Sequence, residues 1–154
     1  MDIANSFPVT SFYFHVEIEG IEVPFQSVSG LGVEHQLRDR TGTKENYNVL
    51  YKEIVGVTYP NIVLKRGIFS NDPEPWKNRR AKTLSQDEDL DSKLEEIRIE
   101  EMYISLVMKN GVILNWTLSN LIPQKWQISA LDSMNNEFLT ETVEFSYEKL
   151  MLNY

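Results

Sequence analysis

The sequence predicts a mainly β fold, an antiparallel β-sandwich or partly open barrel with one packed α-helix. Three observations lead to this class. Apolar and polar residues alternate along several short segments, as in strands that bury one face. Asn110-Gly111 joins two apolar segments, which is a strong signal for a β-hairpin. Few helical segments have the spacing that connects parallel strands, so an antiparallel arrangement is favoured.

The first half of the chain contains several predicted strands, at residues 12–19, 23–28, 33–40 and 47–54. They follow an N-terminal arm over residues 1–11. Pro24 places its strand near a sheet edge, because proline has no N–H to donate to a ladder. Residues 41–46 are polar and predict a loop. We therefore expect residues 38–51 to form a long hairpin that protrudes from the body.

The run Tyr59-Pro60-Asn61-Ile62-Val63-Leu64-Lys65-Arg66-Gly67 predicts a well-defined strand entry. The residue before a proline is pushed toward extended geometry, and proline is tolerated where a strand begins. Ile62 and Leu64 are then expected on one face, with Lys65 on the other. On local physics alone, this run is an ordinary strand with a defined start.

One confident helix start lies at Asp72-Pro73-Glu74. Asp72 is expected to cap the helix, and Pro73 suits the first helical position. Trp76, Arg80 and Leu84 then fall on one helical face.

Charge is concentrated in two neighbouring segments. Residues 87–101 contain eight acidic and two basic side chains, a net charge of −6 within a chain of net charge −8. Residues 73–84 contain four basic and one acidic side chain, a net charge of +3. Residues 86–101 are expected to form an acidic link, either a second short helix or an unstructured loop. The basic cluster is short, and the acidic chain argues against specific nucleic-acid binding.

The second half of the chain returns to strand patterns, at residues 102–108, 112–119, 123–128 and 139–149. In the last of these, Leu139, Val143, Phe145 and Tyr147 are expected to face inward. Glu137 and Glu141 are a candidate carboxylate pair for a shared cleft, but no feature of the sequence singles them out.

Composition and motifs argue against catalysis. The 154 residues are most simply one domain, without cysteine for disulfides or thiolate metal sites. His15 and His35 lack the spacing of metal ligands, and no nucleophile or phosphate-binding motif is present. No apolar run approaches the roughly 20 residues that span a bilayer, and residues 1–5 do not resemble a secretory signal. We expect no enzyme activity, cofactor or membrane insertion.

Six ordered landmarks resemble the tube proteins of contractile phage tails and related contractile injection systems. The landmarks are Phe12-Tyr13-Phe14, Phe25-Gln26-Ser27-Val28-Ser29-Gly30-Leu31, the run 59–67, Trp76, the group Trp116, Asn120, Pro123 and Lys125-Trp126, and finally Asn135-Asn136-Glu137 with Glu141-Thr142-Val143-Glu144. The resemblance extends over residues 12–150. The acidic stretch from Gln86 to Glu101 departs from the family by its length and charge.

The resemblance implies a structural subunit that forms hexameric rings, stacked into a hollow tube inside a contractile sheath. The implied partners are other copies of the chain, the sheath protein, baseplate and tube-cap proteins, and protein cargo in the bore. Such a tube is assembled in the bacterial cytoplasm as part of a phage tail or a released tail-like particle. The alternatives are a baseplate-proximal ring that initiates the tube and, from a different class, a monomeric β-sandwich that binds a ligand.

Three groups of residues are candidates for assembly contacts. The candidates for the lumen wall are Glu17, Glu19, Glu144 and Glu148. The candidates for contact between rings lie on the hairpin and are Thr41, Lys44, Glu45, Tyr47 and Tyr51. The candidates for contact with a neighbouring subunit or the sheath are Lys65, Arg66, Arg79, Arg80, Asp87, Glu88 and Asp89. An acidic bore would repel nucleic acid and resist adhesion of acidic cargo.

Overall fold

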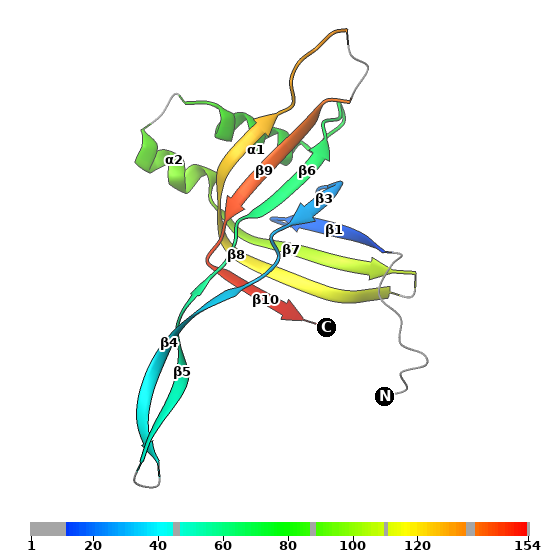
Figure 1. The fold of residues 1–154 in the computed structure, drawn as a ribbon. Helices are drawn as coiled ribbons and strands as arrows, with labels where there is room; N and C mark the ends of the chain where they lie inside the picture. The colour runs from blue at the N-terminus through cyan, green and yellow to red at the C-terminus, as the bar shows by residue number, and fades with distance from the viewer. Residues whose placement is uncertain (1–11, 45–46, 87–88, 110, 135–137, 154) are drawn as a thin grey trace.

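The structure, a computed structural model, describes residues 12–44, 47–86, 89–109, 111–134 and 138–153. The strands of this part are β1 (Tyr13–Ile18), β2 (Ile21–Glu22), β3 (Ser27–Ser29), β4 (Glu34–Lys44), β5 (Tyr47–Thr58), β6 (Ile62–Gly67), β7 (Ile99–Met108), β8 (Gly111–Ile128), β9 (Thr140–Ser146) and β10 (Lys149–Asn153). The helices are α1 (Glu74–Leu84) and α2 (Leu90–Ile97), drawn in Figure 1. The mainly β class is confirmed, with two helices where one packed helix is predicted.

Eight strands form one antiparallel sheet in the order β2-β1-β7-β8-β9-β6-β3, with β10 beside β8. The sheet does not close into a barrel, because β2 and β3 remain at its two ends. We call β2-β1-β7-β8-β10 the lower half-sheet and β8-β9-β6-β3 the upper half-sheet, after their positions in Figure 1.

Strand β8 belongs to both half-sheets. Its first part pairs with β7 and β10, and its last part pairs with β9. The sequence predicts two separate strands here, residues 112–119 and 123–128, and that separation is wrong. Asn120 adopts a left-handed φ of 56°, and the register against β9 shifts between Pro123 and Lys125. A bulge bends a strand sharply, so the chain changes direction without leaving the sheet.

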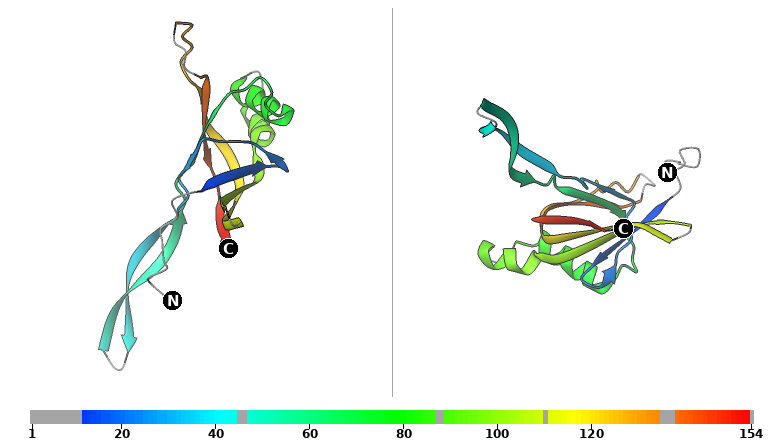
Figure 2. Two further views of the ribbon diagram at one scale, coloured as in Figure 1. Left: turned by 90° about the vertical axis from the view of Figure 1, so that its right-hand side faces the viewer. Right: turned by 90° about the horizontal axis from the view of Figure 1, so that it is seen from below.

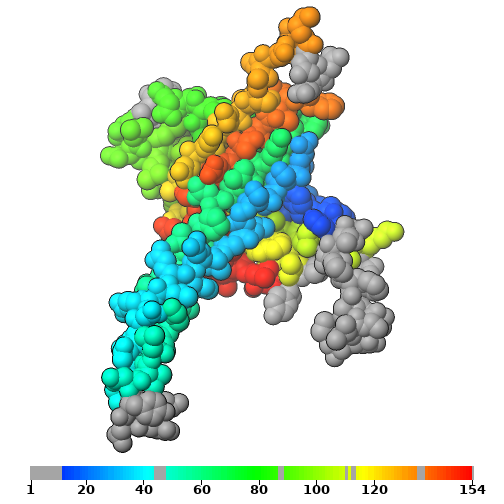
Figure 3. Space-filling view, viewed as in Figure 1, coloured from blue at the N-terminus to red at the C-terminus, as the bar shows by residue number. Residues whose placement is uncertain are grey.

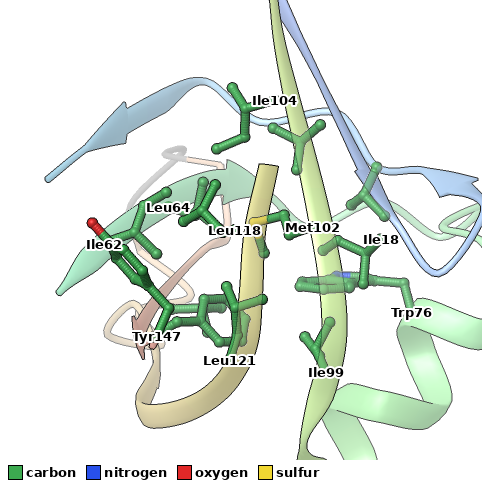
Figure 4. Close-up of a cluster of buried hydrophobic side chains, with 14 of the residues drawn as sticks. Ile18, Ile62, Leu64, Trp76, Ile99, Met102, Ile104, Leu118, Leu121 and Tyr147 are labelled. Carbon is green, nitrogen blue, oxygen red and sulfur yellow. The ribbon is translucent and has the colours of Figure 1, made fainter. Parts of the chain in front are cut away.

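The hydrophobic core lies between the two half-sheets (Figure 4). Val16 on β1 and Val143 and Phe145 on β9 are buried, as their alternation predicts. Ile62 and Leu64 are buried on β6, which confirms the inward face predicted for that strand. Side chains from both half-sheets therefore share a single cluster.

The predicted strand over residues 23–28 is divided in the structure. β2 ends before Pro24, and β3 begins after it, at Ser27. The two short strands pair with different partners, β1 and β6. Because Pro24 has no N–H to donate, it suits the point where the chain leaves one half-sheet for the other.

The hairpin β4–β5 stands away from both half-sheets in Figures 1 and 3, and the two further views in Figure 2 show the same separation. It is longer at its base than the hairpin predicted over residues 38–51, because β4 begins at Glu34 and β5 ends at Thr58. Towards the tip, β4 continues to Lys44. Most of the predicted loop at residues 41–46 is therefore strand. Residues 45–46 and the predicted N-terminal arm over residues 1–11 lie outside the described residues.

The base of the hairpin is positioned by the run 59–67 and by Gly30. Gly30 has a φ of 95°, and a Cβ at this position would lie 2.1 Å from the carbonyl oxygen of Asn61, so only glycine fits. The Tyr147 hydroxyl donates a hydrogen bond to the Gly30 carbonyl at 3.2 Å. Its ring also lies 5.3 Å from that of Tyr59, between centroids.

Helix α1 starts at Glu74, directly after Pro73. The expectation that Asp72 caps this helix is wrong, because its carboxylate bonds Arg66 and Arg80 instead. Within the described residues, neither helix combines the length and apolar character needed to cross a membrane.

The sequence left open whether the acidic link forms a second short helix or an unstructured loop. The structure contains the helix, α2, over residues 90–97. Lys93 is buried and donates hydrogen bonds to the backbone carbonyls of Lys82 and Ser85. A lysine that binds the last carbonyls of a helix satisfies groups with no partner inside it. Lys93 thereby ties α2 to the end of α1.

Candidate assembly surfaces

Four charged side chains, three of them buried and Arg80 partly buried, form a cluster between the upper half-sheet and α1. Arg66 on β6 and Glu141 on β9 are 1% and 0% exposed. Arg66 donates to Asp72 at 3.0 and 2.5 Å and to Glu141 at 2.7 Å. Arg80 on α1 donates to Glu141 at 2.8 and 2.6 Å and to Asp72 at 2.9 Å. Two positive and two negative charges therefore balance inside the subunit. We call these four residues the Glu141 cluster.

Two indole groups complete the surroundings of Glu141. Trp76 donates its Nε1–H to one carboxylate oxygen at 3.1 Å, and Trp126 donates to the other at 2.9 Å. The two indole rings also contact each other, with centroids 4.9 Å apart. In the described part of the chain, every buried side-chain nitrogen and oxygen has a hydrogen-bond partner. A buried charged network is stabilising only when it is satisfied in this way.

The cluster keeps both carboxyl groups ionised. Burial alone raises the pKa of Asp72, but hydrogen bonds from Arg66 and Arg80 outweigh burial, and the pKa lies well below its usual range. Burial also raises the pKa of Glu141, and donors from the two arginines and two tryptophans lower it below the ordinary value. The joint between α1 and the upper half-sheet is therefore charged at neutral pH.

The prediction that Arg66 contacts a neighbouring subunit or the sheath is corrected by this geometry. Its guanidinium is enclosed, and its bonding partners all belong to the same chain. Arg80 is largely committed to the same cluster. Lys65, in contrast, lies exposed on the outward face of β6.

The sequence does not single out Glu141 or Asp72 as members of a cluster. One signal is nevertheless present on β9, because Glu141 has the same parity as the buried Val143 and Phe145. A glutamate at an inward position indicates a buried partner, since an unpaired charge there is costly. The identity of that partner is not visible, because Arg66 lies 75 residues away in the chain.

A second group of charges, in which Arg79 is mostly buried and Glu19 is exposed, lies beside α1. Arg79 donates to Glu19 at 2.7 Å and to the backbone carbonyl of Ile97 at 3.0 Å. This contact fastens the β1–β2 turn to the helices. Asp89 is exposed and directly precedes α2.

Some predicted contact residues cannot be compared with the structure. Glu45, Asp87 and Glu88 lie outside the described residues, and so do the side chains of Lys44 and Tyr47. The hairpin tip is therefore represented by the backbone of Lys44 and Tyr47, which pair with each other.

The two faces of the hairpin differ, and we call the one with three large exposed hydrophobic side chains the apolar face and the other the charged face. The apolar face also carries the exposed ion pair of Asp39 and Lys52, which lies between the pair Leu37–Ile54 and the pair Thr41–Leu50. Leu37, Leu50 and Ile54 lie on the apolar face and are 57%, 70% and 60% exposed. Thr41 lies on the same face, opposite Leu50. Among the described residues, β4 and β5 contact almost only each other, so the apolar face has no cover within that part of the subunit.

On the charged face, Arg38 and Arg40 both donate to Glu53, at 2.9 and 3.0 Å. Tyr51 lies on this face, and its ring packs over Gly42, where a Cβ would lie 2.8 Å from the ring carbon Cε1. Tyr51 and Thr41 therefore lie on opposite faces of the hairpin.

The four candidate lumen glutamates do not share one face. Glu17 lies on the outward face of the lower half-sheet, and Glu144 on the outward face of the upper half-sheet, where it accepts a hydrogen bond from Asn61 at 3.0 Å. Glu19 and Glu148 lie in turns beyond the ends of β1 and β9. Since both outward faces point away from the shared core, one flat wall cannot contain Glu17 and Glu144 together.

The outward face of the lower half-sheet is polar. A shallow hollow there is lined by His15, Glu17, Glu22, Tyr103, Ser105 and Val107. His15 contacts Glu22 through a hydrogen bond. Among the described residues, no three His, Asp or Glu side chains converge as a metal site requires.

A comparison of the sequence with known protein families agrees with this fold. The model of the family described as T4-like virus tail tube protein gp19 matches residues 10–151. The chain therefore belongs to this family. No curated protein sequence matches the chain.

Solved structures with the same fold come from contractile assemblies. A chain in the anti-feeding prophage cap, its tube terminating cap, is 21% identical with a TM-score of 0.72, and the match covers 99% of this chain and 95% of that one. A chain in the sheath-tube complex of the extracellular contractile injection system PVC is 19% identical with a TM-score of 0.70, covering 98% and 95%. A chain in the anti-feeding prophage baseplate is 24% identical with a TM-score of 0.66, covering 96% and 97%.

Proposed function

We propose that this tail tube protein is the structural subunit of an inner tube, in which hexameric rings stack into a hollow conduit propelled by sheath contraction. The observation that carries the proposal is the apolar face of the hairpin, which leaves Leu37, Leu50 and Ile54 in water. A two-stranded hairpin without further packing is only marginally stable. Exposed apolar surface of this kind marks a protein interaction site. A neighbouring ring would cover it.

Residues of the hairpin that the sequence nominates belong to this contact in our proposal. They are Thr41, Lys44, Glu45, Tyr47 and Tyr51. Thr41 would contribute to the apolar face, and Tyr51 to the charged face.

The free strand edges support closure into a ring. Among the strands that the structure describes, β2 and β10 each pair with a single strand and lie at the two edges of the lower half-sheet. Unpaired edges invite uncontrolled association unless an assembly uses them. Head-to-tail pairing of these edges around a closed ring would satisfy them. The outward face of the lower half-sheet, with Glu17, would then line the bore, and Glu144 would face away from it.

Charged residues outside this wall are our candidates for contact with the sheath or a neighbouring subunit. They are Lys65, Arg79, Asp87, Glu88 and Asp89. Structures with similar chains are described as a sheath-tube complex, a tube terminating cap and a baseplate, which supports sheath, cap and baseplate partners. The proposal includes assembly in the bacterial cytoplasm, incorporation into a tail-like particle and passage of protein cargo. It assigns no catalysis, cofactor or specific nucleic acid.

A specialised ring that initiates the tube at the baseplate is the second candidate, since a baseplate chain shares the fold. The two roles differ in behaviour, because a main tube subunit polymerises without limit, whereas an initiator stops at a ring that binds baseplate proteins. A monomeric ligand-binding β-sandwich, from a different class, would form neither rings nor tubes.

Negative-stain electron microscopy of the purified full chain tests the proposal. We expect rings and tubes, with six subunits in end-on class averages. A protein that remains monomeric at every concentration would overturn the tube proposal. In a reconstruction of the tube, a position of Glu17 outside the bore would overturn the wall assignment alone.

A further inference from the structure

A second apolar surface lies at the end of the upper half-sheet, around the connection from β8 to β9. Its members are large exposed hydrophobic side chains, namely Phe69, Ile128, Leu131, Met134, Phe138 and Leu139. Three of them, Leu131, Met134 and Phe138, are 83%, 91% and 87% exposed. We call these six residues the distal apolar end.

The members of the distal apolar end are neighbours because three strands end together there. The Ile68 N–H donates to the Leu139 carbonyl at 2.8 Å, which joins the end of β6 to the start of β9. The Ser129 N–H donates to the Thr140 carbonyl at 2.9 Å, which joins the end of β8 to β9. Leu139, predicted to face inward, is exposed instead because it precedes β9 and lies beyond the core.

The distal apolar end and the hairpin lie at opposite ends of the subunit. In Figures 1 and 3 the β8–β9 connection extends upward and the hairpin extends downward, and the left view of Figure 2 shows the same opposition. Most of the exposed large hydrophobic side chains of the described residues belong to these two places. Two different patches at opposite ends are the arrangement that a head-to-tail contact requires.

We infer that the distal apolar end receives the hairpin of a second copy of this chain, in the next ring along the tube. The inference rests on the proposed tube function and names the surface with which the hairpin pairs. Leu37, Leu50 and Ile54 would pack against Leu131, Met134 and Phe138 of that copy. One such contact leaves a free hairpin and a free distal end, so it repeats along the axis. A hairpin-to-hairpin contact would instead stop at two rings.

Cross-linking tests this pairing directly, since the chain contains no cysteine. One variant combines Leu50→Cys with Leu131→Cys, a second combines Leu37→Cys with Leu131→Cys, and both are assembled and treated with a short bismaleimide. The two sites lie at opposite ends of one subunit, so a link joins different copies. We expect a ladder of covalent oligomers that continues past the number of subunits in one ring. Each single-cysteine variant should give dimers at most.

The outcomes separate the inference from the proposed function. Tubes without a ladder would overturn the inference and leave the tube proposal standing. A ladder that stops at the number of subunits in one ring would place the contact within the ring and would also overturn the inference. A chain that forms neither rings nor tubes would overturn the tube proposal, and the inference with it.

A polar variant of the distal apolar end provides an independent measurement. The combined substitutions Leu131→Asn, Met134→Gln and Phe138→Ser should leave single rings and reduce the tube fraction at least tenfold, with an unchanged melting temperature. The matched control replaces Leu90 and Leu94 on α2, which are also exposed, by glutamine and should retain tubes. Wild-type tube yields from the first variant would contradict the inference.

Discussion

The Glu141 cluster and the hairpin β4–β5 are unusual in opposite ways. The cluster places charged side chains inside the subunit, and the hairpin places large apolar side chains in solvent. Beneath α1, the buried side chains of Arg66, Asp72 and Glu141 and the partly buried Arg80 are bonded to one another. On the hairpin, Leu37, Leu50 and Ile54 are exposed, and no other part of the described chain covers them. Both arrangements are costly unless a partner compensates for them.

The difference lies in where the partner comes from. The charges of the cluster are satisfied within one chain, so the cluster belongs to the stability of the subunit. The apolar face of the hairpin has no partner within the described chain, so in our proposal it belongs to the stability of the tube. Perturbing the two regions should therefore change two different measurements.

The largest expected effect is on assembly. Replacing residues 39–52 by Asn-Gly would keep Arg38 and Glu53 paired across a two-residue turn. We expect single rings without tubes in electron micrographs, because Leu50 and the protruding part of the hairpin are lost while Leu37 and Ile54 remain at its base. The melting temperature of the subunit should stay within a few degrees of wild type, since the hairpin contributes little to the core. Tubes of normal length would contradict the role of the hairpin.

The next largest effect is on subunit stability. Glu141→Gln leaves Arg66 and Arg80 with one buried carboxylate, and removing one partner of a buried charge pair costs about 3–5 kcal/mol. Urea unfolding of dissociated subunits would measure this loss. The control Glu148→Gln, in an exposed turn, should change the free energy of unfolding by less than about 0.5 kcal/mol. Equal effects from both variants would contradict the structural role of the cluster.

Acid should weaken the cluster. The pKa values of Asp72 and Glu141 are lowered in the folded chain, so their contribution to stability is complete above the unfolded pKa values of about 4 and falls as the pH drops below them. Each group can contribute a slope of up to about 1.4 kcal/mol per pH unit. Urea unfolding across pH 2–6 would measure the slope, which should be shallower for Glu141→Gln. An identical slope in the variant would argue against the assignment.

The smallest effect is expected from the charged face of the hairpin. Arg38 and Glu53 form an ion pair that is largely open to solvent, and exposed pairs contribute about 0–1 kcal/mol. The double variant Arg38→Gln with Glu53→Gln should therefore unfold within about 1 kcal/mol of wild type. A loss as large as that of Glu141→Gln would show that the hairpin supports the core.

Local patterns predicted the strands well, and distant contacts were harder to predict. Alternation placed Ile62 and Leu64 inward on β6 because parity depends only on neighbouring residues. The continuity of β8 was missed, because Pro123 looks like the start of a new strand. The bend at Asn120 was also missed, because no sequence pattern indicates that this residue adopts a left-handed φ.

The sequence alone determined the inward faces of the main strands, the start of α1 near Pro73 and the resemblance to tube proteins. These features depend on periodicity and on residues close together in the chain. Only the tertiary structure decided that Arg66 is a buried partner of Glu141, that Glu17 and Glu144 face apart, and that the distal apolar end lies opposite the hairpin. Each of these depends on how two half-sheets fold over β8, and residues far apart in the chain set that geometry.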